Sequence, residues 1–211
     1  MLLNTGVVSL SPTTPLTFAP QLLGTESGIL TVKLTNTGAS ALTVSSISVQ
    51  GEYKLSDTCG KTVAAGANCA INVRSAPSTQ GALTGTVTIH DSASSKPQVI
   101  ELSGAGTVVQ LTPSSLNFSP QTVNTKSSPQ HVQLTNTSSA VLTITSVYVE
   151  GTNWTSFLQT NNCGSSLAAG ATCTLNLTFD PVKKGSLKAS LNVYDPGGGT
   201  FQSVPLTGTG D

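Results

Sequence analysis

The chain repeats itself once over nearly its whole length. Residues 16–104 and 116–208 align almost without gaps, and the phrase LTNT at positions 34–37 recurs at positions 134–137. A repeat of roughly 100 residues is longer than the unit of a solenoid, which spans about 20–50 residues. It has instead the length of a domain with a core of its own. The sequence therefore predicts a tandem of two homologous domains.

The two predicted domains span residues 1–105 and 106–211 and meet at the short joint Ala105-Gly106-Thr107. The start of the chain is similar to this joint, because Thr5-Gly6-Val7-Val8 resembles Gly106-Thr107-Val108-Val109. The last residues also match the end of the first copy. We therefore expect the chain to be part of a longer protein that contains further domains.

Apolar and polar residues alternate along most of the chain. Leu30, Val32 and Leu34 fall on one side of an extended segment, and Val132 and Leu134 repeat the pattern in the second copy. A period of two is typical of a half-buried strand, and turn-forming residues separate such segments at the spacing of a sandwich. With about seven strands per copy, the fold class is predicted as all-β, two tandem immunoglobulin-like antiparallel β-sandwiches.

One predicted strand changes phase in both copies. Leu42 and Val44 are two residues apart, but the next apolar residues are Ile47 and Val49. The second copy repeats this spacing. An extra residue turns the side chains to the other face, which predicts a β-bulge or a strand that crosses between sheets. Two separate short strands are the alternative interpretation.

The composition argues against several classes of function. Only 9% of the residues are charged and the formal net charge is zero, whereas a nucleic-acid binder carries a basic surface. No run approaches the roughly 20 apolar residues of a membrane-spanning helix. We therefore expect neither nucleic-acid binding nor membrane insertion of this segment.

The four cysteines form two pairs with identical spacing, Cys59 with Cys69 and Cys163 with Cys173. Both partners of a pair lie within one copy, so each domain can close its own disulfide. Free thiols and a metal site are the alternatives, but a tetrahedral site needs four ligands and each copy offers two cysteines and one histidine. Disulfides would place the protein in an oxidising compartment, so it is expected to be secreted, periplasmic or at the cell surface.

The sequence contains no set of residues that is typical of catalysis. His90-Asp91 resembles part of a catalytic site, but the second copy has Tyr194-Asp195 there. The aspartates precede turns, where a carboxylate accepts hydrogen bonds from backbone N–H groups. His90 and His131 are expected at the surface. No phosphate-binding loop, nucleophile elbow or metal motif occurs, so no cofactor and no enzymatic activity are expected.

Aromatic residues are few. Trp154 has no counterpart in the first copy, in which Tyr53 lies near the equivalent position. The default interpretation is that Trp154 packs beneath its own loop. Contact of Trp154 and Tyr53 with a ligand or a partner is the alternative. Lys183-Lys184 and Lys188 form a small basic group near a turn, which we interpret as a solvated loop.

Several longer phrases are shared with a known family. They are LTNTGASALTVSSISVQGEY, CGKTVAAGANCAINV and LSGAGT in the first copy, and LTNTSSAVLTITSVYVEG, CGSSLAAGATCTLNLTFDP and LTGTG in the second. These phrases resemble bacterial choice-of-anchor D repeats, which belong to the ASH/hydin-type immunoglobulin-like domains. The resemblance covers nearly the whole chain. It implies a sandwich related to the major sperm protein and to pilus chaperones, and it supplies no catalytic residues.

The two copies differ at one place within the shared phrases. Arg74-Ser75-Ala76-Pro77 stands where the second copy has Thr178-Phe179-Asp180-Pro181. Because Ser75 is not apolar, the first sandwich is expected to be less well packed at that edge.

Together these observations favour a non-catalytic role. The chain is expected to be a spacer or interaction module of a larger secreted or cell-surface bacterial protein, with other domains of that protein as partners and with a protein or a glycan as a further partner. A carbohydrate-binding or adhesive module is the first alternative. An intracellular scaffold of the ciliary or centrosomal type is the second.

Overall fold

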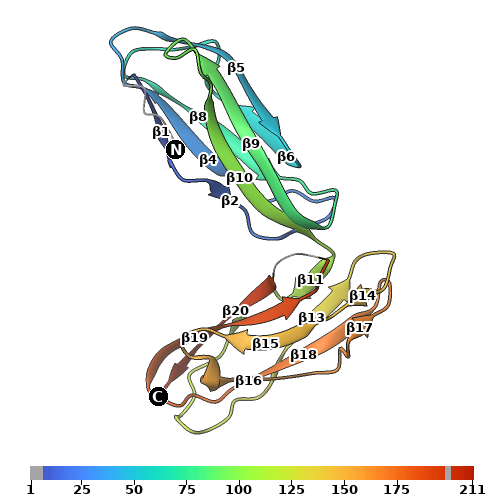
Figure 1. Ribbon diagram of the computed structural model, residues 1–211. Helices are drawn as coiled ribbons and strands as arrows, with labels where there is room; N and C mark the ends of the chain where they lie inside the picture. The colour runs from blue at the N-terminus through green and yellow to red at the C-terminus, as the bar shows by residue number, and fades with distance from the viewer. Residues whose placement is uncertain (1–6, 198–200) are drawn as a thin grey trace. The chain divides into compact units, whose positions relative to one another are not determined.

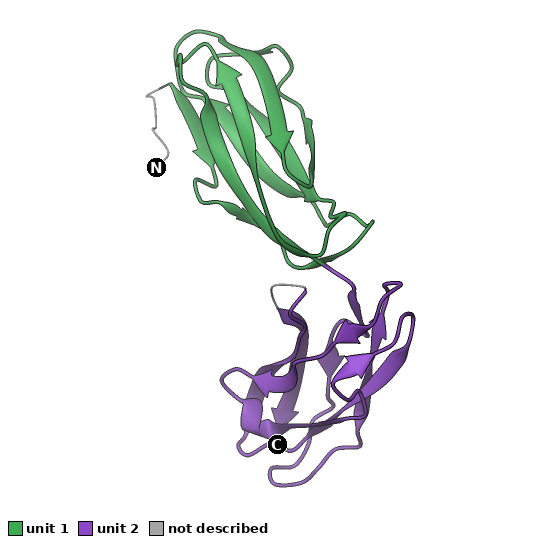
Figure 2. Cartoon of the chain, turned by 45° about the vertical axis from the view of Figure 1, so that its right-hand side comes forward, with its two compact units in different colours: residues 1–106 green, residues 107–211 purple. Residues whose placement is uncertain are grey.

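The computed structural model describes residues 7–197 and 201–211. The regular secondary structure of these residues consists of strands and one short 3-10 helix. The chain divides into two compact units, Met1–Gly106 and Thr107–Asp211 (Figure 2). The all-β fold class is confirmed. Within the described residues, no helix is long and apolar enough to span a membrane.

Unit 1 consists of short strands together with a few long ones. They are β1 (Val8–Ser11), β2 (Leu16–Thr17), β3 (Gln21–Leu22), β4 (Leu30–Asn36), β5 (Leu42–Gln50), β6 (Tyr53–Asp57), β7 (Thr62–Val63), β8 (Asn68–Ser75), β9 (Gly81–Asp91) and β10 (Gln98–Thr107). One sheet has the order β1-β4-β8-β6 and the other the order β2-β10-β9-β5-β7, with β3 also on β10 (Figure 1).

Unit 2 repeats this arrangement. Its elements are β11 (Val109–Thr112), β12 (Leu116–Asn117), β13 (Gln130–Asn136), β14 (Leu142–Thr143), β15 (Ser146–Glu150), the 3-10 helix η1 (Trp154–Ser156), β16 (Phe157–Asn161), β17 (Ser166–Leu167), β18 (Thr172–Phe179), β19 (Gly185–Tyr194) and β20 (Phe201–Gly210). The sheets have the orders β11-β13-β18-β16 and β12-β20-β19-β15, and β14 pairs with β17 (Figure 1).

Both units have the strand order of an immunoglobulin-like sandwich. Without its two-residue strands, the described part of unit 2 has seven strands. The first, second, fifth and fourth (β11, β13, β18 and β16) form one sheet, and the seventh, sixth and third (β20, β19 and β15) form the other. The described part of each unit contains more strands than the expected seven, because the extra ones are two-residue segments at turns and edges. The expected joint is also shorter, since β10 continues to Thr107 and β11 begins at Val109.

The phase change has a different outcome in each unit. In unit 1 the strand β5 is continuous and its pairing shifts between Val44 and Ser46, which is the predicted bulge. Its first residues pair with β7 and its later residues with β9, so the strand also crosses between neighbours. In unit 2 the same segment is divided into β14 and β15. Both interpretations of the sequence are therefore realised, one in each copy.

The core of each unit is formed by the alternating aliphatic residues that the sequence singled out. Val32 and Leu34 of β4 are completely buried, as are Val132 and Leu134 of β13. Burial of this kind supplies most of the stabilisation of a sandwich, at roughly 25 cal/mol per Å² of apolar surface.

The space beside Ser75 is filled by an aromatic side chain from the neighbouring strand. Tyr53 pairs with Ser75 across β6 and β8, and its ring lies 5.5 Å from that of Phe18. The hydroxyl of Tyr53 donates a hydrogen bond to the carbonyl oxygen of Leu83 at 3.2 Å. The expected loosening of this edge is thus compensated by Tyr53, although the Ser75 hydroxyl is buried without a hydrogen-bond partner.

Unit 2 fills the equivalent space with a second phenylalanine. Phe157 and Phe179 are paired across β16 and β18, and the ring centroid of Phe179 lies 5.0 Å from that of Phe157 and 5.6 Å from that of Phe118. The structural counterpart of Tyr53 is therefore Phe157. The two units reach a closed core by different combinations of side chains.

Candidate functional site

The four cysteines form two structural disulfides. Cys59 is bonded to Cys69, and Cys163 is bonded to Cys173, with Cα–Cα distances of 4.8 and 5.0 Å. All four side chains are buried. Each bridge ties the loop after an edge strand to the start of the neighbouring strand, so the bridges stabilise the sandwich and are not reactive centres.

The polar residues that the sequence singled out, Asp91, His90 and His131, lie at a turn or at the surface. Oδ1 of Asp91 accepts a hydrogen bond from the backbone N–H of Ala93 at 2.8 Å, which confirms the predicted turn cap. His90 and His131 are exposed, as expected. Among the residues that the structure describes, no group of three His, Cys, Asp or Glu side chains is arranged to hold a metal ion.

Tyr53 is not a surface contact residue. It is only 6% exposed and belongs to the core of unit 1. Burial is the main reason why the pKa of Tyr53 is raised above its ordinary value, with the nearby Glu52 carboxylate as a second cause. In the comparison of the two copies, Tyr53 stands near the position equivalent to Trp154. The strand pairing instead places Tyr53 opposite Ser75, in the core. The interpretation of Tyr53 as a ligand or partner contact is therefore wrong.

Trp154 is exposed, with 56% of its surface accessible, and does not pack beneath its own loop. It lies in η1, which follows Gly151 and precedes β16. Gly51 and Gly151 both have a positive φ at the end of equivalent strands, and Tyr53 is equivalent to Phe157. Residues 152–155 are therefore an insertion in unit 2, and this insertion carries the tryptophan.

Two further apolar side chains are exposed on segments that adjoin the one containing Trp154. Leu158 on β16 is 41% exposed, and Val182 in the loop after β18 is 53% exposed. Ser156, which lies between Trp154 and Leu158 in the sequence, joins this segment to the loop of Val182. Its carbonyl oxygen accepts the N–H of Asp180 at 2.9 Å, and its hydroxyl accepts the N–H of Val182 at 3.3 Å. We call the residues Trp154, Leu158 and Val182 the β16 edge surface.

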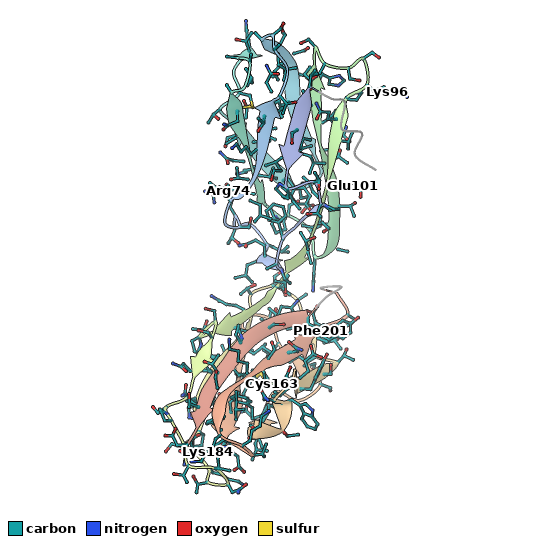
Figure 3. All side chains as sticks on the ribbon, turned by 90° about the vertical axis from the view of Figure 1, so that its left-hand side faces the viewer. Arg74, Lys96, Glu101, Cys163, Lys184 and Phe201 are labelled. Atoms are coloured by element: carbon teal, nitrogen blue, oxygen red, sulfur yellow. A yellow bond between two sulfur atoms is a disulfide. The ribbon has the colours of Figure 1, made fainter. Side chains whose placement is uncertain are left out.

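The lysines of the basic group, Lys183, Lys184 and Lys188, lie next to the β16 edge surface. Lys183 and Lys184 come immediately after Val182, and both are exposed. Lys188 lies beside the insertion, since its backbone N–H donates to Oδ1 of Asn153 at 3.0 Å. In Figure 3, Lys184 lies at the end of unit 2 that is opposite to Phe201.

A second group of aromatic residues was missed by the sequence reasoning. Tyr194 and Phe201 pair across β19 and β20 with ring centroids 5.3 Å apart, and Tyr148 of β15 meets Phe201 edge-on at 5.7 Å. Phe201 is exposed and both tyrosines are partly exposed. Tyr148 is far from the other two in the sequence, and only the pairing of β15, β19 and β20 brings the three residues to one sheet face.

Unit 1 has an open depression on the face of its second sheet, with a volume of about 740 Å³. Its walls include Thr17, Gln50, Thr86, Glu101 and Ser103. These side chains offer hydroxyl and amide groups and one carboxylate but no aromatic ring. The depression therefore has no stacking surface of the kind that sugar-binding sites use.

Comparisons with known proteins give no family. No protein-family model matches the chain, and no curated protein matches it. Among solved structures, a protein of unknown function from Porphyromonas gingivalis W83 is 14% identical with a TM-score of 0.41, over 97% of this chain and 100% of that one.

Two other solved structures are similar at the same low level. The ASH/PapD-like domain 7 of human CEP192 is 16% identical with a TM-score of 0.37, over 50% of this chain and 86% of that one. The YadV chaperone is 12% identical with a TM-score of 0.30, over 95% of this chain and 98% of that one. Similarity at this level assigns no activity and no ligand to the chain.

Proposed function

We propose that this chain is a non-catalytic pair of immunoglobulin-like domains from a larger secreted or cell-surface bacterial protein, in which it connects or projects other domains. The observation that carries the proposal is that each unit completes its own fold. Each unit has its own core, its own disulfide and its own buried asparagine, Asn36 in unit 1 and Asn136 in unit 2. A module of this kind can be repeated along a chain without depending on its neighbours.

The disulfides support an exported location for the parent protein. Structural disulfides persist in oxidising compartments and are rare in the cytosol. Labelling of free thiols in protein isolated from its native source should therefore modify none of the four cysteines. Four reactive thiols in that material would favour the intracellular scaffold instead.

Replacement of the module in its parent protein tests the connecting role. Residues 16–208 would be exchanged for an unrelated tandem of immunoglobulin-like domains of equal length, and in a second variant they would be deleted. A connecting role predicts that the replacement supports normal function of the neighbouring domains and that the deletion does not. Loss of function after the replacement, at unchanged expression and export, would contradict the proposal.

A carbohydrate-binding module is the second candidate, and the group Tyr148, Tyr194 and Phe201 favours it. Aromatic rings on one sheet face are the surface on which sugar rings stack. A glycan array would reveal binding, and Phe201→Ala or Tyr148→Ala should then remove it. The alternative fails if wild-type protein binds no glycan, or if both variants bind as the wild type does.

A further inference from the structure

The outer edge of β16 presents unpaired backbone groups. β16 is the last strand of the sheet β11-β13-β18-β16, and hydrogen bonds from Asp180 to Ser156 and from Asn162 to Thr174 show which residues face β18. In an antiparallel pair, residues whose backbone N–H and C=O groups bond to the neighbouring strand alternate with residues whose N–H and C=O groups point away from it. The backbone groups of Gln159 and Asn161 therefore point away from the sheet.

The equivalent edge of unit 1 is protected by charges. Lys54 of β6 forms an ion pair with Glu26, and the guanidinium of Arg74 on the neighbouring strand donates to the carbonyl oxygen of Ser27 at 2.7 Å. The Glu52 carboxylate accepts hydrogen bonds from Ser78 and Thr79. Charged side chains on an edge strand discourage the addition of another strand.

Unit 2 lacks the charges of Lys54 and Arg74 at the corresponding positions. Leu158 stands for Lys54 and Thr178 for Arg74, as the equivalent pairings across β6–β8 and β16–β18 show. Val182 stands for Ser78, and the inserted Trp154 adds a large exposed ring. The same fold therefore offers a charged edge in unit 1 and an apolar edge in unit 2, so the apolar edge is not a requirement of the fold.

The charges around the β16 edge surface are mainly positive. Lys183 and Lys184 lie at the end of the surface where β16 begins, and Lys188 lies beside the insertion. Lys126 occupies the position that Glu26 has in unit 1, because Ser127 and Ser27 make equivalent hydrogen bonds to β18 and β8. All four lysines are exposed. Asp180 lies next to them in the sequence, and Asp211 follows Gly210, which pairs with Gly185. A segment with negative charge complements this end of the strand.

We propose that β16 accepts an extended segment of a partner protein as an additional antiparallel strand, with apolar residues of that segment against Trp154 and Leu158 and acidic residues at its carboxyl end beside Lys183 and Lys184. Backbone hydrogen bonds to Gln159 and Asn161 supply affinity, and the apolar and charged contacts supply selectivity. The inference goes beyond the proposed connecting role, which does not require such a contact.

The chain has a single tryptophan, so Trp154 itself reports the binding. The probe is a synthetic peptide with the sequence of β18, the known antiparallel partner of β16, with serine in place of Cys173 and a run of aspartates at its carboxyl end. Addition of this peptide to the full chain should shift the emission of Trp154 to shorter wavelength in a saturable manner, because the exposed indole becomes buried. The same peptide with lysines in place of the aspartates should bind roughly tenfold more weakly at low salt.

The decisive variant is Leu158→Lys, which restores the residue type found in unit 1 and is therefore compatible with the fold. It should weaken binding by about tenfold or more while leaving the thermal unfolding of unit 2 close to that of the wild type. The matched control is Lys54→Leu in unit 1, which should leave the response of Trp154 unchanged. No change in Trp154 emission up to the solubility limit of the peptide, or equal binding by Leu158→Lys, would overturn the proposal.

Sedimentation at increasing protein concentration distinguishes another occupant. Self-association that Leu158→Lys abolishes would mean that a second copy of the chain covers the edge, which contradicts the partner segment proposed here. The replacement experiment in the parent protein does not depend on β16. Failure of the peptide to bind is therefore distinguishable from failure of the connecting role.

Discussion

Two buried asparagines hold equivalent turns in the two units. In unit 2 the Asn136 side chain donates to the carbonyl oxygens of Ala140, Leu167 and Ala168 at 2.7–3.1 Å and accepts from the N–H of Ser138. In unit 1 Asn36 donates to Ser40 and Val63 in the same way. One side chain thus satisfies backbone groups of two segments far apart in the sequence.

The first prediction concerns this residue. Asn136→Ala should lower the free energy of unfolding of unit 2 by about 2–3 kcal/mol, because several buried carbonyl groups lose their donor. Urea unfolding followed by the emission of Trp154 measures it, since the only tryptophan lies in unit 2. Asn136→Asp is the comparison and should be at least as harmful, as it loses the donors and buries a charge. A loss below about 0.5 kcal/mol in Asn136→Ala would contradict the role of the side chain.

The second prediction concerns Glu52 and pH. Hydrogen bonds from the Thr79 side chain and the Ser78 backbone lower the pKa of Glu52 from 4.5 to about 2. Since the pKa in the folded state is depressed, the stabilisation is fully present above about pH 4.5 and is lost as the pH falls toward 2. A carboxyl NMR titration should show the low pKa. Glu52→Gln should be less stable than wild type at pH 7, and the difference should shrink toward pH 2; a constant difference would contradict this.

At the scale of elements, unit 1 has one aromatic residue on β6 and none on β8, whereas unit 2 has Phe157 on β16 and Phe179 on β18. This difference decides which side chains the last strand tolerates. A Cβ atom at Gly208 of β20 would lie 2.7 Å from Cζ of Phe179. At the equivalent Gly104 of β10, the nearest atoms are Cβ of Phe18 and the hydroxyl of Tyr53, at 3.4 and 3.5 Å. Identical residues at equivalent positions therefore meet different surroundings.

The third prediction follows from this comparison. Gly208→Ala should destabilise unit 2 by about 1–3 kcal/mol through overpacking against Phe179. Gly104→Ala is the matched control and should change the stability of unit 1 by less than about 1 kcal/mol, because its contacts are ordinary ones. Thermal unfolding of the two variants measures both effects. Equal effects in the two units would show that Phe179 does not set the difference.

The pairing of β16 with β18 also explains why part of the site was predictable and part was not. The disulfides could be predicted because both cysteines of a pair recur at fixed spacing in each copy. The exposure of Trp154 could not, because it depends on residues 152–155 forming a turn outside the sandwich. A sequence signal did exist, since the alignment of the copies changes its offset between Gly151 and Phe157.

At the scale of the whole molecule, each unit is closed by its own disulfide. Reduction of Cys163–Cys173 should lower the free energy of unfolding of unit 2 by roughly 2–3 kcal/mol, the effect expected for a short loop. The double variant Cys59→Ala, Cys69→Ala should destabilise unit 1 by a similar amount. Because both bridges are internal to their units, this variant should leave the unfolding curve of Trp154 unchanged. A shift of that curve would show that unit 2 depends on the bridge of unit 1.

The repeat and the alternation of apolar residues determined the two-copy organisation and the all-β class, because a period of two fixes which side chains can face a core. The same alternation predicted that Val32, Leu34 and their counterparts Val132 and Leu134 lie in the core. The tertiary structure alone decided that Tyr53 is a core residue, that one phase change is a bulge and the other a break, and that Tyr148, Tyr194 and Phe201 share a face. These outcomes depend on which strands become neighbours, and strand pairing joins residues whose separation in the sequence carries no periodic signal.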